Sequence, residues 1–180
     1  IIKNQSIETI LNLVEKNTFD FILVNAENRN VDIPSQYYSD ANDFFVDLAW
    51  HATLTGVTIY RKEILFRKNY TKYIGSNFIQ LGIILEELLE NTDGLYWLNN
   101  KMMDVNKNKA ESYWAKEIFK VFAEDWFDLI NDLPKAYLYE NKLQVLKSHS
   151  YHTGLFKFKN FITLRKRNIL NLKSYLKVYR

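Results

Sequence analysis

Three side chains that can move a proton lie close together in the first third of this sequence. Asp43, Asp47 and His51 lie on or just after a predicted helix, residues 39–50, that Ser39 can cap. A carboxylate or imidazole can take the proton of a hydroxyl as that hydroxyl attacks another group. All three are therefore candidate catalytic bases. Structural roles are open as well: Asp43 can interact with the helix dipole, Asp47 can lie on a solvated face, and His51 can be a hydrogen-bonded structural histidine.

Four further side chains are candidate binding residues for an acceptor molecule. Trp50 and Tyr60 offer flat apolar faces on which a sugar ring can stack, although core packing is the commoner use of Trp. Asn77 and Gln80 come at the predicted start of a helix. There they can donate to hydroxyl or phosphate groups together with free backbone N–H groups. Capping of the helix is the simpler role for Asn77.

A metal site is weakly indicated. His149 and His152 are three residues apart but have no acidic residue or cysteine near them in the sequence. The chain has no cysteine, which excludes disulfides, thiolate metal sites and a cysteine nucleophile. Glu86 and Glu87 fall on a nearly all-apolar helix, so we expect at least one of them to be paired or at the rim of the core.

The elements that must position these residues follow from apolar spacing and turn residues. We predict a fold of the α/β class that is rich in helix. The helix that follows Gly75 is apolar in almost every direction and is therefore expected to be buried. Predicted helices are residues 6–16, 39–50, 62–68 (a turn or two), 76–89, 112–133 and 163–179, with more helix between Pro134 and a turn near Gly154. Predicted strands are residues 19–25 and 54–60, and two short strands, 95–98 and 101–105, that pair with each other; residues 26–38 are a predicted loop.

Composition indicates one globular core in a chain of 180 residues, of which 47% are apolar and 16% aromatic. The apolar runs are far shorter than the roughly 20 residues that span a bilayer. No signal-peptide pattern is present, so we expect a cytoplasmic protein that does not cross a membrane. Because Ile1 and Ile2 begin the sequence without Met, we expect it to be cut from a longer chain.

The net charge of +3 conceals an uneven distribution, because residues 141–180 hold ten of the 24 basic residues and none of the 21 acidic ones. Residues 155–180 also interleave aromatic and aliphatic side chains with Lys and Arg. This pattern is typical of a helix on an anionic membrane surface. Nucleic-acid binding is a rival interpretation that we disfavour. A solvated helix face packed on the body of the protein explains the pattern equally well.

Two stretches resemble the second half of bacterial family 2 glycosyltransferases. They are WHATLTGVTIYRKEI, residues 50–64, and YIGSNFIQLGIILE, residues 73–86. In that family an R-[KR]-E step ends a strand and leads to a helix that starts G-S-x-F-x-[HQ]; residues 61–63 and 75–80 match this order and spacing. The opening residues resemble the helix and strand that follow the family's acidic metal loop. The nearest group is the abequosyltransferase-like enzymes of capsule and lipopolysaccharide assembly.

The resemblance implies a GT-A-type enzyme that transfers a sugar from a nucleotide-sugar to a saccharide or lipid-linked acceptor in surface polysaccharide biosynthesis. It also implies a divalent metal, Mn²⁺ or Mg²⁺, whose D-x-D ligands are not in this chain; Asp125 and Asp128 lie within a predicted helix and are poor substitutes. Many relatives carry an acidic E-D pair where this chain has Ser76 and Asn77, so the usual catalytic base has no matching residue.

We therefore expect a helix-rich C-terminal portion of a GT-A-like fold. Residues 1–110 would form the acceptor-side part and residues 111–180 a helical region with a basic tail. Alone, this chain would be inactive, because the donor-binding half is missing. The tail would hold the protein at the inner face of the membrane. The alternative is a non-enzymatic module that uses the basic aromatic tail to bind a membrane or nucleic acid.

Overall fold

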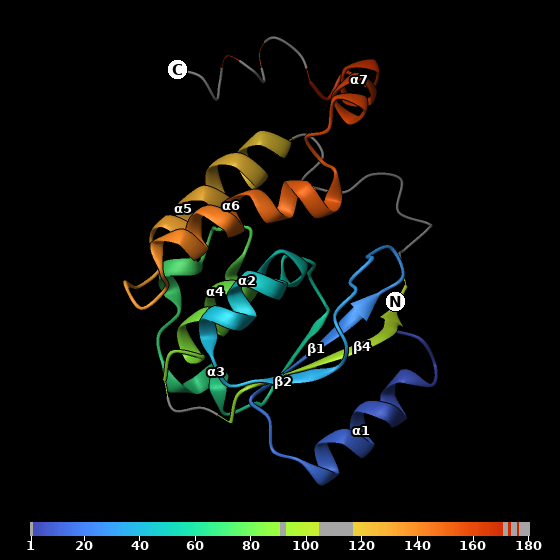
Figure 1. Ribbon diagram of the computed structural model, residues 1–180, viewed down its shortest axis with the longest axis vertical. Helices are drawn as coiled ribbons and strands as arrows, with labels where there is room; N and C mark the ends of the chain where they lie inside the picture. The colour runs from blue at the N-terminus through green and yellow to red at the C-terminus, as the bar shows by residue number, and fades with distance from the viewer. Residues whose placement is uncertain (1, 91–92, 105–116, 171–172, 174–175, 177–180) are drawn as a thin grey trace.

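The computed structural model describes residues 2–90, 93–104, 117–170, 173 and 176. Within them the fold is mixed α/β, built on a four-stranded sheet in the order β2-β4-β1-β3 (Figure 1). The two central strands, β1 (Phe21–Ala26) and β4 (Leu95–Met103), run parallel. The edge strands β2 (Gln36–Tyr38) and β3 (Thr58–Tyr60) are antiparallel to their neighbours. Every residue of β1 is buried, as its sequence, apolar except for Asn25, predicts.

The prediction of two short paired strands after Gly94 was wrong. Residues 95–98 and 101–103 belong to the single strand β4, which pairs with β1 on one side and β2 on the other. Asp93 and Gly94 precede this strand rather than turning within a hairpin, and the Gly94 carbonyl accepts from the backbone N–H groups of Asp20 and Phe21. Residues 26–38 were predicted as a loop, but their last three residues form β2. A pairing partner distant in sequence leaves no local signal for such short strands.

The helices predicted around the sheet are largely confirmed. Asp40, rather than Ser39, caps the helix α2 by accepting from the N–H groups of Asn42 and Asp43. The predicted strand 54–60 is shorter, because a turn at Leu54 and a positive φ of 95° at Gly56 delay it to Thr58. The helices are α1 (Ser6–Lys16), α2 (Ala41–Ala52), α3 (Ile64–Arg67), the 3-10 turn η1 (Thr71–Tyr73), α4 (Ile79–Glu87), the π-helix η3 (Lys120–Asp125), α5 (Trp126–Asn131), α6 (Tyr139–Thr153) and α7 (Phe158–Lys166).

The C-terminal helices differ most from prediction. The helix predicted at 112–133 is described from residue 117 and consists of η3 followed by α5; residues 112–116 lie outside the described residues. Gly154, with a φ of 66°, ends α6 as expected. The basic helix begins at Phe158 rather than near Thr163, and α7 ends at Lys166. Most of residues 171–179, where the predicted helix continues, lies outside the described residues. Asn168 then takes a φ of 55°, which is incompatible with a continuing helix.

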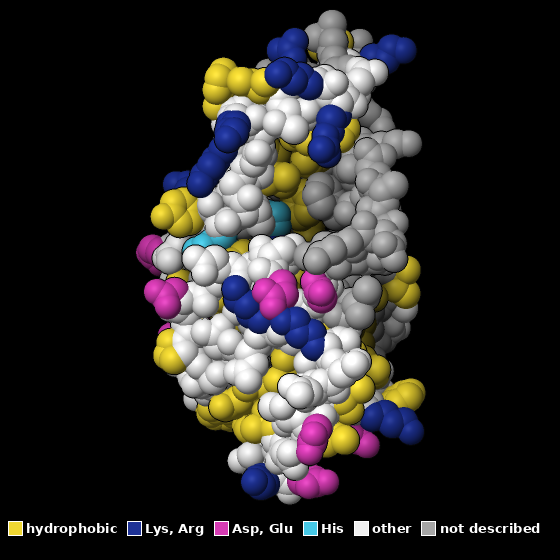
Figure 2. Space-filling model, turned by 90° about the vertical axis from the view of Figure 1, so that its right-hand side faces the viewer, with side chains coloured by type: hydrophobic (Ala, Val, Ile, Leu, Met, Phe, Trp, Pro, Cys, Tyr) yellow, Lys and Arg dark blue, Asp and Glu magenta, His cyan; other side chains and the backbone are white. Residues whose placement is uncertain are grey.

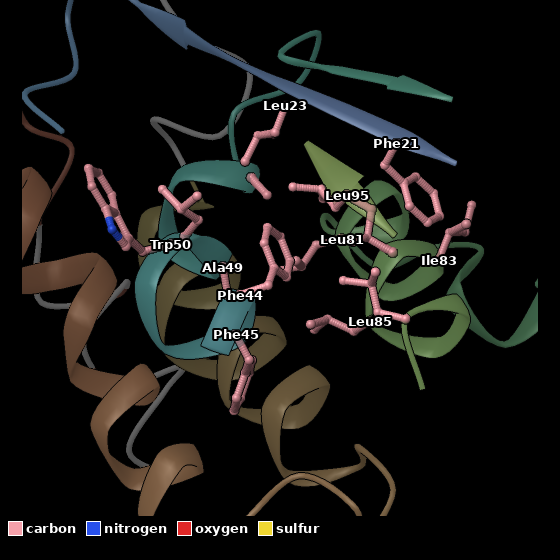
Figure 3. Packing of buried hydrophobic residues seen from close by; sticks show 14 of the residues in the cluster. Phe21, Leu23, Phe44, Phe45, Ala49, Trp50, Leu81, Ile83, Leu85 and Leu95 are labelled. Carbon is pink, nitrogen blue, oxygen red and sulfur yellow. The ribbon is translucent and has the colours of Figure 1, made fainter. Parts of the chain in front are cut away.

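The core lies between the sheet and α2 and α4. Figure 3 shows Phe44 and Ala49 of α2 facing Leu81 and Leu85 of α4, with Leu95 of β4 close by. All five side chains are buried, and α4 is buried on nearly all sides as its sequence predicts.

The same core continues into α5 and α6, because Trp126, Leu129 and Val145 belong to it. The Tyr137 hydroxyl donates to the carbonyl of Leu85 at 2.5 Å, which ties the start of α6 to α4. One hydrophobic core therefore joins the two regions into which the sequence was divided, and that division stays a prediction. Within the described residues, no helix has the length and apolar character needed to cross a membrane.

Candidate functional site

The parallel strands β1 and β4 end at the same edge of the sheet, and ligands of α/β sheets commonly bind at such an edge. The end of α2 is joined to β1 by a hydrogen bond between His51 and Val24. Arg29, in the loop after β1, places its guanidinium 5.1 Å from the centre of the Trp50 ring. The His152 imidazole stacks on the same indole, at a centroid distance of 4.2 Å and an angle of 10°. Trp50 is only 2% exposed. Its ring is therefore covered by these neighbours, and a sugar could stack on it only after displacing them.

His51 turns the other way, into the core. Its Nε2–H donates to the carbonyl of Val24 at 3.0 Å, and its ring meets Trp97 edge-on at 5.1 Å. The side chain is fully buried, and Nδ1 has no hydrogen-bond partner among the described residues. Burial lowers the pKa of His51 to about 4. Through its hydrogen bond to Val24, His51 joins α2 to β1, and its imidazole has no exposed surface.

The other two histidines lie on α6. His149 is buried and stacks on Phe122 at 4.4 Å, and burial lowers its pKa to about 3. Burial also lowers the pKa of His152. The charge of Arg29 adds to this lowering at His51, His149 and His152 alike. The charge of one guanidinium therefore acts on all the histidines of the chain. We call Arg29, Trp50, His51, His149 and His152 the Arg29 cluster.

The predicted bases Asp43 and Asp47 lie on another part of α2. Asp47 accepts a 2.9 Å hydrogen bond from the Tyr38 hydroxyl, which in turn accepts from Gln36. Burial raises the pKa of Tyr38, and the charges of both aspartates raise it further. Asp43 is exposed in the first turn of the helix. The structure thus brings the two aspartates together beside Tyr38 and away from His51, which faces the sheet.

The two stretches that carry the resemblance are in contact. The Tyr60 hydroxyl donates to the Gln80 carbonyl at 3.0 Å, and the Gln80 side chain donates to the carbonyl of Thr53 at 3.3 Å. Burial raises the pKa of Tyr60, which is half-buried and meets Phe21 edge-on. The end of α2, strand β3 and the start of α4 are therefore joined at one point through side chains predicted to bind an acceptor.

Asn77 has a partner that the sequence did not predict. Its side-chain amide donates to Asp125 Oδ2 at 2.5 Å, and Lys120 pairs with the other carboxylate oxygen at 2.7 Å. Asp125 lies at the end of η3, 48 residues away in sequence. A pocket of about 310 Å³ opens here, lined by Lys72, Tyr73, Gly75, Ser76, Asp125, Asp128, Leu129 and Asp132. The helical spacing of residues 117–133 could place Asp125 on a helix but not beside Asn77.

Arg29 was also missed by sequence reasoning, since an arginine in a polar loop carries no signal of what it will contact. The described residues contain no group of three His, Cys, Asp or Glu side chains that could hold a metal ion. The described residues therefore do not supply the ligands of the divalent metal that the resemblance implies. His149 and His152 stack on different aromatic rings and gain no third ligand.

Comparison of this chain with protein-family models, curated proteins and solved structures finds no match.

Proposed function

We propose that this chain is the acceptor-side part of a glycosyltransferase that moves a sugar from a nucleotide-sugar to a saccharide or lipid-linked acceptor in surface polysaccharide biosynthesis. The observation that carries the proposal is the contact between Asn77 and Asp125. The family that the sequence resembles places an acidic pair where this chain has Ser76 and Asn77. Here, Asp125 brings a carboxylate to the same helix start from another part of the chain.

Asp125 is held in a fixed position beside a pocket. Its side chain is only 10% exposed, Asn77 and Lys120 fix both carboxylate oxygens, and the adjacent pocket can admit a ligand. In the proposed step the carboxylate takes the proton of an acceptor hydroxyl as that oxygen bonds to the anomeric carbon, and the nucleotide leaves with the electrons of the broken C–O bond. The divalent metal that the resemblance implies would be held by residues other than the described ones, which offer no donor set for it.

The test uses this chain and the same chain extended upstream, each incubated with UDP-, GDP-, CMP- and dTDP-sugars and Mn²⁺. We expect donor binding and hydrolysis only in the extended form. In that form, Asp125→Asn should lower kcat by about a hundredfold or more, whereas Asp32→Asn, on an exposed loop, should leave it unchanged. Asp43→Asn and Asp47→Asn test the bases that the sequence favours. Activity in neither form would overturn the proposal.

Attachment to an anionic membrane surface through α7 is a second candidate function. Phe158 is 81% exposed and Ile162 lies one turn later on the same side. Counting 100° per residue, Arg165, Lys166 and Lys159 flank this pair. Figure 2 shows Lys and Arg side chains beside hydrophobic ones over the upper part of the molecule, where Figure 1 places α7. Apolar side chains flanked by cations are typical of helices that lie in the headgroup region.

Sedimentation with vesicles tests this candidate. Vesicles that contain phosphatidylserine should carry the protein down, and neutral phosphatidylcholine vesicles should not. Phe158→Ser should weaken binding. Phe66→Ser should not, although Phe66 is 77% exposed, because the neighbouring Arg67 and Lys68 are paired with carboxylates. Binding to an oligonucleotide but not to vesicles would favour the nucleic-acid alternative instead.

A further inference from the structure

Arg29 differs from the other charged groups in the interior of this protein. Asp20 and Glu87 are both fully buried, and each is paired with two cations: Asp20 with Arg61 and Arg67, Glu87 with Arg67 and Lys68. Arg29 forms no ion pair with any described residue, and its Nη1 is buried without a hydrogen-bond partner. A guanidinium in this position loses hydration without gaining a counter-ion, which is costly.

The neighbours of Arg29 hold it in place but do not neutralise it. The Trp50 ring lies under the guanidinium at 5.1 Å, and His152 packs on that ring. The charge of Arg29 reaches all three imidazoles, and among the described residues no carboxylate contributes to the pKa of Arg29 or of any histidine in the cluster. The Arg29 cluster therefore carries a positive charge that has no ion-pair partner among the described residues, whereas the buried Asp20 and Glu87 are both paired.

The place in the fold also favours a ligand. Arg29 follows the carboxyl end of β1, the central strand, where loops of α/β sheets bind phosphate-bearing molecules. Figure 2 shows histidine side chains at the surface beside a hollow with hydrophobic walls. His152 is exposed and Arg29 is half-buried, so an incoming group can reach both from solvent.

We propose that the Arg29 cluster binds a phosphate-type oxyanion, with the Arg29 guanidinium as its principal donor over Trp50 and the His152 ring at its edge. The guanidinium fork can pair with two oxygens of a phosphate at once, and the half-buried Arg29 side chain is partly open to solvent. The site is separate from the Asn77–Asp125 contact, so this proposal does not depend on the proposed sugar transfer.

The test uses the full chain and inorganic pyrophosphate at low ionic strength. The sequence has only three histidines, all in the Arg29 cluster, so their ring Cε1–H signals in proton NMR report on this site alone. Pyrophosphate should shift the His152 signal saturably. Arg29→Gln should weaken pyrophosphate binding about tenfold or more. The affinity of Arg29→Lys should lie between those of the parent and Arg29→Gln, because a lysine keeps the charge but not the guanidinium fork. Lys135→Gln removes one positive charge from an exposed turn and should bind as the parent does.

Two further ligands identify where the anion comes from. If UDP or GDP binds more tightly than pyrophosphate, the oxyanion belongs to a nucleotide; equal affinity means that the diphosphate alone is recognised. The proposal is overturned if pyrophosphate gives no saturable shift, if acetate at the same concentration gives an equal one, or if Arg29→Gln binds pyrophosphate as well as the parent does. Arg29→Gln should remain folded, because it removes an unpaired charge. If it does not fold, Arg29→Lys tests the site instead.

Discussion

The His152 imidazole lies flat on the Trp50 indole, with ring centroids 4.2 Å apart and planes 10° apart. The two residues come from the ends of α6 and α2, more than a hundred positions apart in sequence. Arg29 also lies over this indole, so one tryptophan joins the loop after β1, the end of α2 and the end of α6. The stack therefore attaches the C-terminal helices to the carboxyl edge of the sheet.

Replacing His152 should loosen this attachment. His152→Ala removes the stacked ring and should lower the free energy of unfolding by about 0.5–1.5 kcal/mol, the usual contribution of an aromatic pair. Trp50 should also become more accessible to acrylamide, a fluorescence quencher. Lys147→Ala, an exposed position on the same helix, is the control and should change neither. Equal urea midpoints for His152→Ala and the parent would show that the stack contributes nothing.

Stability should fall as the pH is lowered through the range in which histidine titrates. Burial lowers the pKa of His51 to about 4 and that of His149 to about 3, whereas both titrate near 6.5 in the unfolded chain. Between these values the unfolded chain binds more protons than the folded one. Each histidine therefore removes about 1.4 kcal/mol of stability per pH unit as the pH falls below about 6.5.

Urea unfolding followed from about pH 7 to about pH 5 measures this dependence. His149→Phe keeps a ring against Phe122 and removes one titrating group, so the slope should become shallower. An unchanged slope in this variant would mean that His149 carries its charge in the folded protein.

Local patterns in the sequence were enough to predict the main helices but not the contacts that form the candidate site. Helix α4 follows from an apolar run, and α2 from a polar cap and a buried aromatic side. Strand β4 was divided in two because its pairing with β1 depends on residues more than 70 positions away. Arg29 and Asp125 were missed for the same reason. Arg29 contacts Trp50 and Asp125 contacts Asn77, and only the folded chain brings these partners close.

Neighbouring glutamates on α4 should differ in their effect on stability. Glu87 is fully buried and accepts a 2.8 Å hydrogen bond from the Tyr70 hydroxyl, close to Arg67 and Lys68. Glu87→Ala leaves that buried hydroxyl without this acceptor and should cost about 1–3 kcal/mol. Glu86 pairs with the exposed Lys72, so Glu86→Ala should cost no more than about 1 kcal/mol. Thermal unfolding of both variants checks the order, and a larger loss for Glu86→Ala would contradict it.

The effect of Gly82→Ala on stability should depend on the neighbouring Tyr73 ring. An alanine Cβ there would lie 2.6 Å from Cδ1 of the buried Tyr73 ring, too close for either atom. Gly82→Ala should therefore lower the free energy of unfolding by about 1–3 kcal/mol, although alanine is the better helix former. In a Tyr73→Ala background the clash is gone, so the same change should raise stability by up to about 1 kcal/mol.

A double-mutant cycle of Gly82→Ala and Tyr73→Ala, measured by urea unfolding, gives the coupling between the two positions. The control is Gly75→Ala, where a Cβ meets nothing within 4 Å but the φ of 91° strains an L-residue. Its cost should be the same with or without Tyr73, because the strain is in its own backbone. If Gly82→Ala instead costs the same in both backgrounds, the helix does not approach the Tyr73 ring as closely as described.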